Sequence, residues 1–116
     1  MMGTCHCRDC QRSSGSAFAT LMIFKKETVA VSVEGIAHYK QPGGSGHSVE
    51  RCFCSQCGSP VSASYDVTPD FSVIFAGTLD DPSLVKPQWN IYTAAKQPWL
   101  ELPPHVNSFA GGYRRN

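Results

Sequence analysis

The six cysteines of this chain fall into two short clusters that share one spacing, C-x-C-x-x-C. The first is CHCRDC at residues 5–10 and the second is CFCSQC at residues 52–57. In an extended backbone, residues two positions apart point to the same face, with Cα atoms roughly 6.6–6.8 Å apart. Two such thiolates can share one ion with Zn–S bonds of about 2.3 Å, and the x-x spacing curls a third sulfur toward the same point. The pattern predicts a zinc protein.

Disulfides are the alternative for an even number of cysteines. Sulfurs one or two residues apart make poor disulfides with each other, although pairing between the two clusters stays open for an oxidised protein. The first residues, MMGT, do not form a basic segment followed by an apolar run, so we expect no secretory signal and a cytoplasmic location. In that reducing compartment, metal binding or catalysis is the commoner use of clustered cysteines.

Length and charge narrow the class of protein. The chain has 116 residues, which predicts a single domain over residues 1–116 with a modest core that a metal would staple. The net charge is +1 with 16% charged residues, which argues against a nucleic-acid surface built on many phosphate contacts. No run of 18 or more apolar residues is present, so we expect no membrane span.

Apolar alternation predicts an all-β fold of short antiparallel strands around the cysteine turns. The polar residues 11–16 predict a short helical turn or a loop. Phe18, Phe53, Phe71 and Phe75 are expected in the core. The expected strands cover residues 17–24, 28–33, 35–41, 47–53, 61–65, 71–77 and 88–93.

Four segments resemble successive signature blocks of one family, the glutathione-dependent formaldehyde-activating enzymes, which also includes centromere protein V. They are HCRDCQRSSGSAF (6–18), RCFCSQCGSPV (51–61), FAGTLDDP (75–82) and NIYTAAKQPWLEL (90–102). The resemblance implies an Mss4-like β-tent fold. It also implies a catalytic zinc on Cys5, Cys7 and Cys10, and a structural zinc that takes two of its ligands from Cys54 and Cys57.

The printed sequence departs from the family pattern at one point. Family members carry a further C-x-C strand ahead of the first block, which completes the structural zinc site, and that segment is not in the printed residues. We therefore expect one or two zinc ions per chain, either in a single mixed site that draws on both clusters or with the second site empty. Cys52 is a candidate substitute ligand. The sheet edge that the strand would cover favours a homodimer.

The resemblance implies a carbon–sulfur lyase reaction in which a thiol such as glutathione adds to formaldehyde. His6 is the candidate acid/base and His47 a weaker one, with a surface imidazole as the alternative for both. Arg8 and Arg12 are candidates for binding glutathione carboxylates. Lys96 and Trp99 are candidate pocket residues; surface charge is the alternative for the cations and core packing for the tryptophan. A non-catalytic zinc module that binds a protein partner is the competing function.

Overall fold

The computed structural model describes residues 1–32, 34–42 and 47–114, and these contain eight strands and one α-helix. The predicted all-β class is confirmed. Contacts divide the chain into two units, Met1–Leu21 with Asp81–Asn116 and Met22–Asp80. Strand β2 (Ala19–Lys25) runs from the first unit into the second. That residues 1–116 form one domain stays a prediction. Within the described ranges, no helix is long and apolar enough to cross a membrane.

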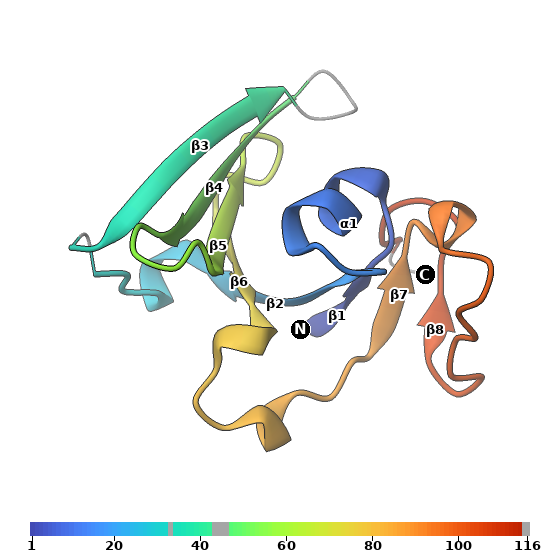
Figure 1. Ribbon diagram of the computed structural model, residues 1–116. Coiled ribbons are helices and arrows are strands. Elements are labelled where there is room, and N and C mark those ends of the chain that lie inside the picture. The colour runs from blue at the N-terminus through green and yellow to red at the C-terminus, as the bar shows by residue number, and fades with distance from the viewer. Residues whose placement is uncertain (33, 43–46, 115–116) are drawn as a thin grey trace. The chain divides into compact units, whose positions relative to one another are not determined.

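The first unit contains three short strands that run parallel to one another (Figure 1). They are β1 (Met2–Cys5), β7 (Trp89–Ile91) and β8 (Asn107–Ser108). The antiparallel expectation is therefore wrong for these strands. Parallel neighbours need long connections, and β1 and β7 lie far apart in the sequence. Their register places Cys5, the first cysteine, opposite Ile91.

Strand β1 passes very close to Trp89 of β7 at Gly3. Gly3 lies opposite Trp89 in the register, and Trp89 is 3% exposed. A Cβ atom at position 3 would overlap the indole ring and the carbonyl oxygen of Trp89. Only glycine fits there, so the seating of the tryptophan and the position of Cys5 at the end of β1 depend on the same residue.

Helix α1 (Arg8–Ser14) follows β1 after two residues, and both of its ends are capped. At the start, the Cys7 side chain accepts a hydrogen bond from the Cys10 N–H. At the end, Gly15 adopts φ +62°, and the N–H groups of Gly15 and Ser16 reach the carbonyls of Arg12 and Gln11. This arrangement is a Schellman motif, which left-handed glycine makes possible. Of the two alternatives predicted for residues 11–16, a helical turn or a loop, the helix is found as far as Ser14, and it begins earlier than predicted, at Arg8.

The second unit is built on antiparallel pairs, as predicted (Figure 1). Strand β3 pairs with β4, β4 with β5, and β5 with β6. The β4–β5 pairing contains a register shift between Cys52 and Phe53, inside the second cysteine cluster. The four strands are β3 (Ile36–Pro42), β4 (Ser48–Cys54), β5 (Pro60–Tyr65) and β6 (Phe71–Phe75).

Two sequence predictions fail in this unit. Residues 29–32 form no strand although they alternate; Val31 is 43% exposed, and Val33 lies outside the described residues. Phe71 is 41% exposed at the start of β6 and Phe53 is half-buried, so neither belongs to the core as Phe75 does. The other helical elements of the described residues are single 3₁₀ turns. Those of the second unit are η1 (Lys26–Thr28) and η2 (Ala76–Thr78), and those of the first are η3 (Pro82–Leu84) and η4 (Thr93–Ala95).

The cores of the two units differ in chemistry. The second is largely apolar, although it also buries Arg51 and Ser62; its buried apolar residues are Met22, Val49, Cys52, Ala63, Val73, Phe75 and Ala76. The first combines apolar residues with buried polar side chains, which are Thr4, His6, Gln11 and Asn90. Thr4, His6, Gln11 and Asn90 are joined by side-chain hydrogen bonds to one another or to the backbone, whereas Nε and Nη1 of the buried Arg51 have no partner among the described residues. The connected polar arrangement therefore lies in the first unit.

Candidate metal centre

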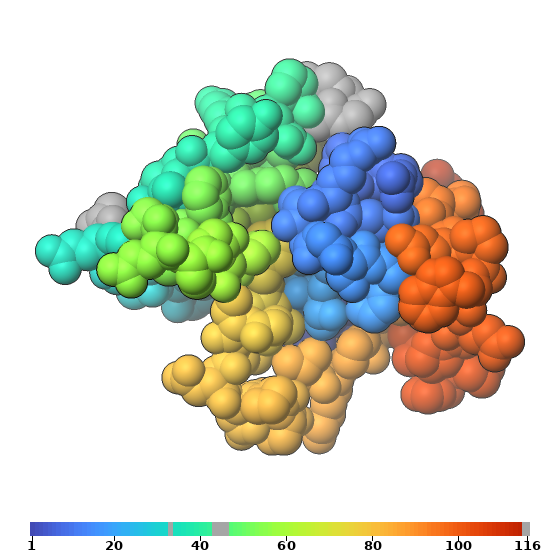
Figure 2. All heavy atoms as spheres, in the orientation of Figure 1, coloured from blue at the N-terminus to red at the C-terminus, as the bar shows by residue number. Residues whose placement is uncertain are grey.

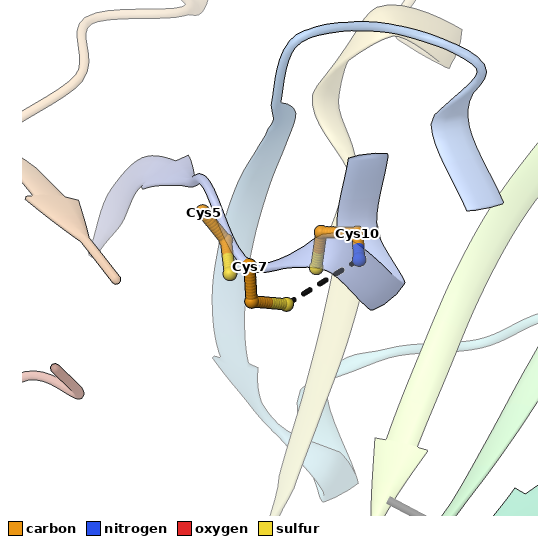
Figure 3. Close-up of side chains that lie close together, drawn as sticks. All are labelled: Cys5, Cys7 and Cys10. Carbon is orange, nitrogen blue, oxygen red and sulfur yellow. Dashed lines mark hydrogen bonds between the residues drawn. The ribbon is translucent and has the colours of Figure 1, made fainter. Parts of the chain in front are cut away.

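The first cysteine cluster brings three sulfurs together where a strand turns into a helix (Figure 3). Cys5 is the last residue of β1, Cys7 has an extended backbone and caps α1, and Cys10 is the third residue of the helix. Their Sγ atoms all lie within 4.8 Å of one another. The extended backbone accounts for the convergence of Cys5 and Cys7, and the first helical turn supplies the third sulfur.

The three thiols differ in exposure and in pKa. Cys5 and Cys10 are 3% and 2% exposed, whereas Cys7 is partly exposed. The thiols of Cys10 and Cys5 donate to the Cys7 sulfur, which lowers the pKa of Cys7. The pKa of Cys5 is raised because hydrogen bonding with Cys10 and then with Cys7 favours its protonated form, and because it is buried. Negative charge in the cluster therefore resides first on Cys7, its most accessible sulfur.

This donor set fits a metal ion. Thiolate sulfur selects soft and borderline cations, of which Zn²⁺ is the commonest in proteins with such clusters. Three protein ligands leave one position of a tetrahedral ion for a substrate, which distinguishes catalytic from structural zinc sites. All six cysteines lie in the described residues, and each is a thiol outside any disulfide, so the cross-paired alternative is not the form described.

His6 lies between two of these cysteines and is 1% exposed, so the surface-imidazole alternative is wrong for it. Thr4 donates its hydroxyl hydrogen to Asn90 Oδ1 at 2.6 Å and lies 2.9 Å from His6 Nε2. The single hydroxyl hydrogen is used on Asn90, so His6 Nε2 must carry the proton that it donates to Thr4. Nδ1 then presents a lone pair, and it is buried without a hydrogen-bond partner among the described residues.

The environment keeps that imidazole neutral. Burial lowers the pKa of His6, and the positive charge of Lys96 lowers it further. Lys96 thus acts on the site electrostatically. Asn90 continues the chain of hydrogen bonds by donating to the Ser108 hydroxyl at 3.1 Å, which links β1, β7 and β8 through polar side chains.

Gln11 clamps the turn that carries the cysteines, a role that the sequence did not reveal. Its side chain is 4% exposed and donates to the His6 carbonyl at 2.7 Å and to the Ala95 carbonyl at 2.9 Å. Its Oε1 accepts from Arg8 and, at 3.4 Å, from Gln97. One amide therefore ties α1 to the segment after β7. The buried position in a polar run gives no periodic signal by which it could be predicted.

Tyr92 is a second residue that sequence reasoning missed. It follows β7 with φ +54°, a left-handed conformation that is uncommon outside glycine. Burial raises the pKa of its hydroxyl, and the negative charges of Cys5, Cys7 and Cys10 raise it further. A strained backbone beside a cluster of charge is a recurrent feature of functional sites, and the positive φ at a tyrosine cannot be read from the sequence.

A cavity of about 380 Å³ in the first unit is lined by both of the predicted carboxylate-binding residues. Arg8 and Arg12 line it from α1, on either side of Cys10 in the sequence, together with Gln11 and Gln97. Figure 2 shows the helix (blue) at the molecular surface, in agreement with the exposure of both arginines.

Trp99 is 69% exposed and donates its indole N–H to Gln97 Oε1 at 2.6 Å, so the core-packing alternative is wrong for it. It contacts a cavity residue without belonging to the lining itself. His47, the weaker acid/base candidate, has a side chain 55% exposed and lies 3.7 Å from Asp66, in the second unit, as its surface-imidazole alternative predicts.

The second cysteine cluster does not gather in the same way. Cys57 is exposed, and its pKa is lowered because the Ser59 hydroxyl and then the Cys54 thiol donate to its sulfur. Among the described residues, no third His, Cys, Asp or Glu side chain completes a metal-binding group with this pair. Cys52 faces His38 instead, with Sγ 3.4 Å from Nδ1.

The fold and the first cluster define a class: a β-sheet protein with a three-thiolate centre at a strand-to-helix turn. The sequence model of the glutathione-dependent formaldehyde-activating enzymes matches residues 1–95. The chain belongs to that family. A comparison with curated proteins found no significant match.

Proposed function

We propose that the protein is a zinc-dependent carbon–sulfur lyase that joins a small thiol to an aldehyde, with glutathione and formaldehyde as substrates. Membership of the family supports the reaction type. The observation that carries the proposal is the three-sulfur centre with its partly exposed Cys7, close in sequence to a cavity with two arginines.

The reaction is an addition that balances without a further reactant. The thiol sulfur forms a bond to the carbonyl carbon, the carbon–oxygen π bond breaks, and the thiol proton ends on the oxygen to give S-hydroxymethylglutathione. When bound to Cys5, Cys7 and Cys10, zinc would supply a Lewis acid and favour the thiolate form of the substrate.

Arg8 and Arg12 bind the carboxylates of glutathione in this account. Both guanidinium groups border one cavity, and charge-assisted bonds to carboxylates are among the strongest that a surface offers. Gln11 fixes the side of the cavity by its bonds to the backbone on either side of the site. Lys96 precedes the lining residue Gln97 in the sequence and the exposed Trp99 donates to it, and in this account the two supply charge and apolar contact.

His6 is the proposed acid/base. Its Nε2–H is committed to Thr4, which leaves Nδ1 as the atom that takes the thiol proton and returns it to the adduct oxygen. The lowered pKa keeps this nitrogen unprotonated at neutral pH. A general base of this kind contributes about 10²–10⁴-fold to the rate.

The test is the rate of adduct formation from glutathione and formaldehyde, followed by NMR exchange spectroscopy with zinc-loaded protein. We expect a rate above the uncatalysed one that is lost in Cys7→Ser. Arg12→Gln should raise KM for glutathione by about 10-fold, because one charge-assisted contact is lost, while Lys26→Gln, which removes an exposed charge in the second unit, should leave KM unchanged.

A second measurement separates catalysis from the competing function. Millimolar glutathione added to cobalt-substituted protein should change the visible spectrum of the metal, because a substrate thiol enters its coordination sphere. An unchanged spectrum together with an uncatalysed rate would contradict the proposal and favour a non-catalytic zinc module that binds a protein partner. A reducing, cytoplasmic location suits the thiol chemistry, and the homodimer remains a prediction for sedimentation analysis.

A further inference from the structure

A second group of metal-binding side chains lies in the second unit, on one face of the β3–β4 pair. His38 lies directly opposite Cys52 in the antiparallel register. Glu50 precedes Cys52 by two residues on β4, and residues two apart on a strand share a face. The register alone therefore collects an imidazole, a carboxylate and a thiol, from two strands, at one place on the sheet.

The distances within this group match a shared ion better than a proton relay. His38 Nδ1 lies 3.4 Å from Cys52 Sγ and 3.4 Å from Glu50 Oε1. A tetrahedral ion with metal–nitrogen and metal–oxygen bonds near 2.0 Å and a metal–sulfur bond near 2.3 Å separates its ligands by about 3.3–3.5 Å. A nucleophile–base–carboxylate relay would instead use the two ring nitrogens separately, whereas both contacts here involve Nδ1.

The surroundings leave room for an ion and its solvent. A cavity of about 160 Å³ is lined by His38 and Cys52 together with Ser62, Ser64 and Ser72, and Glu50 lies outside this lining. Ser62 lies opposite Cys52 on β5, and Ser64 lies opposite Glu50. The side chains of His38 and Glu50 are 51% and 45% exposed, which gives the ion a path from solvent, whereas Cys52 is 9% exposed.

We propose that His38, Glu50 and Cys52 form a second metal site, separate from the three-cysteine cluster, that binds a borderline divalent cation such as Zn²⁺. One thiolate, one imidazole and one carboxylate suit zinc, while Mg²⁺ and Ca²⁺ require oxygen donors throughout. Three ligands leave a fourth position for water, next to the serine hydroxyls. In this account Cys52 belongs with His38 and Glu50 rather than with Cys54 and Cys57.

The experiment is zinc protection of individual thiols against alkylation, resolved by peptide mass spectrometry. Metal-free, reduced protein is titrated with Zn²⁺, and the alkylation of each cysteine is measured at every zinc concentration. In the wild type we expect zinc to protect Cys52. His38→Ala should raise the zinc concentration that protects it by more than about 100-fold, since even changes outside the ligand shell cost about 10–100-fold.

Matched variants separate this site from general effects on the fold. Glu50→Gln should weaken protection of Cys52 by at least about 10-fold, because a neutral amide replaces a charged ligand. His47→Ala removes another exposed histidine beside a carboxylate, His47–Asp66 at 3.7 Å, and should change nothing. Protection of Cys5, Cys7 and Cys10 should be the same in all of these variants, which makes the outcome independent of the proposed lyase activity.

Three results would overturn the proposal. The first is a Cys52 that zinc never protects, as expected if the three side chains only form hydrogen bonds. The second is protection that survives both His38→Ala and Glu50→Gln. The third is an equal loss of protection in His47→Ala. Circular dichroism of each variant shows whether it is folded, and Glu50→Gln, which conserves size and shape, decides the question if His38→Ala unfolds.

Discussion

The two cysteine clusters have the same spacing and different structures. Residues 5–10 bring three sulfurs within 4.8 Å of one another. In residues 52–57, Cys52 faces His38 across the sheet, while Cys54 and Cys57 lie together at a turn. The C-x-C-x-x-C spacing gives only the separation of the cysteines along the sequence. Whether their sulfurs converge depends on the backbone conformation after the second cysteine of each cluster.

The backbones diverge because of what surrounds each cluster. After Cys7 the chain enters a helix that continues to Ser14, so Cys10 comes round on its first turn. Strand β4 instead continues through Cys54, and Gly58, at φ +77°, then reverses the chain toward β5. The Gly58 N–H bonds to the Cys54 carbonyl at 2.8 Å, which closes the turn tightly. A glycine directly after the last cysteine is thus the sequence signal for a closed turn.

The largest expected effect is that of Cys7→Ser compared with Cys57→Ser. Cys7→Ser removes a ligand and the main site of negative charge from the first cluster, so bound zinc should fall by about one ion per chain. Catalysis should fall by about 10²–10³-fold, since a Lewis acid supplies several kcal/mol. Cys57→Ser should leave the rate unchanged. Elemental analysis and the NMR assay measure both, and equal effects of the two variants would mean that the clusters do not differ as described.

Gly3→Ala tests the close contact that seats the first cluster. The new Cβ atom would overlap Trp89, so β1 and β7 must separate, and we expect a loss of about 1–3 kcal/mol in the free energy of unfolding. Gly111→Ala is the control in the same unit, because nothing lies within 4 Å of the Cβ atom it would add. Urea denaturation measures both. A Gly3→Ala variant as stable as the control would refute the contact.

A pair of glycine variants compares the two turns directly. Gly15 and Gly58 have φ +62° and φ +77°, and a Cβ atom at either position would meet nothing within 4 Å. Each change to alanine should therefore cost only the left-handed backbone energy, about 1–2 kcal/mol. Gly15→Ala should also weaken zinc protection of Cys10, whereas Gly58→Ala should not. The opposite pattern, measured by thiol alkylation, would reverse the roles assigned to the turns.

The smallest effect concerns pH. Burial lowers the pKa of His6, so the unfolded chain binds a proton more readily than the folded one, and stability falls as pH drops below about 6.5. The Ser48 N–H lowers the pKa of Asp66, and this shift affects the stability of the fold only below the ordinary aspartate pKa of 3.8. The first unit, which holds both tryptophans, should therefore loosen first. Tryptophan fluorescence should show this transition in the wild type and not in His6→Gln.

Sequence patterns predicted the second unit better than the first. Strands β3–β6 are long enough to show alternation or an apolar run, and the pairs β3–β4, β4–β5 and β5–β6 each join strands that are consecutive in the sequence. Residues 28–33 alternate as well, yet residues 29–32 pair with nothing, because alternation specifies a face and not a partner. Strands β1 and β8 are short, and the parallel pairing of β1 with β7 depends on contacts between distant residues that no local pattern encodes.

At the candidate metal centre, too, features that depend on local sequence were easier to predict than those that depend on distant residues. The convergence of the sulfurs of Cys5, Cys7 and Cys10 was predictable because their geometry is local. That Arg8 and Arg12 line one cavity follows from their places on either side of Cys10 in the sequence, and their carboxylate binding stays a prediction. The tautomer of His6, which the Thr4–Asn90 bond determines, and the clamp by Gln11 were not, since both depend on residues from 90 onward. The group of His38 with Cys52 depends on a strand register, which becomes visible only once the strands are paired.

X-ray absorption at the zinc edge tests the central claim, that residues 5–10 alone form a three-sulfur centre with one open position. The sample is the Cys52→Ser variant loaded with one equivalent of zinc, so that the proposed site of His38, Glu50 and Cys52 does not contribute. We predict three sulfur neighbours at about 2.3 Å and one nitrogen or oxygen neighbour. Four sulfurs, or two, would contradict it.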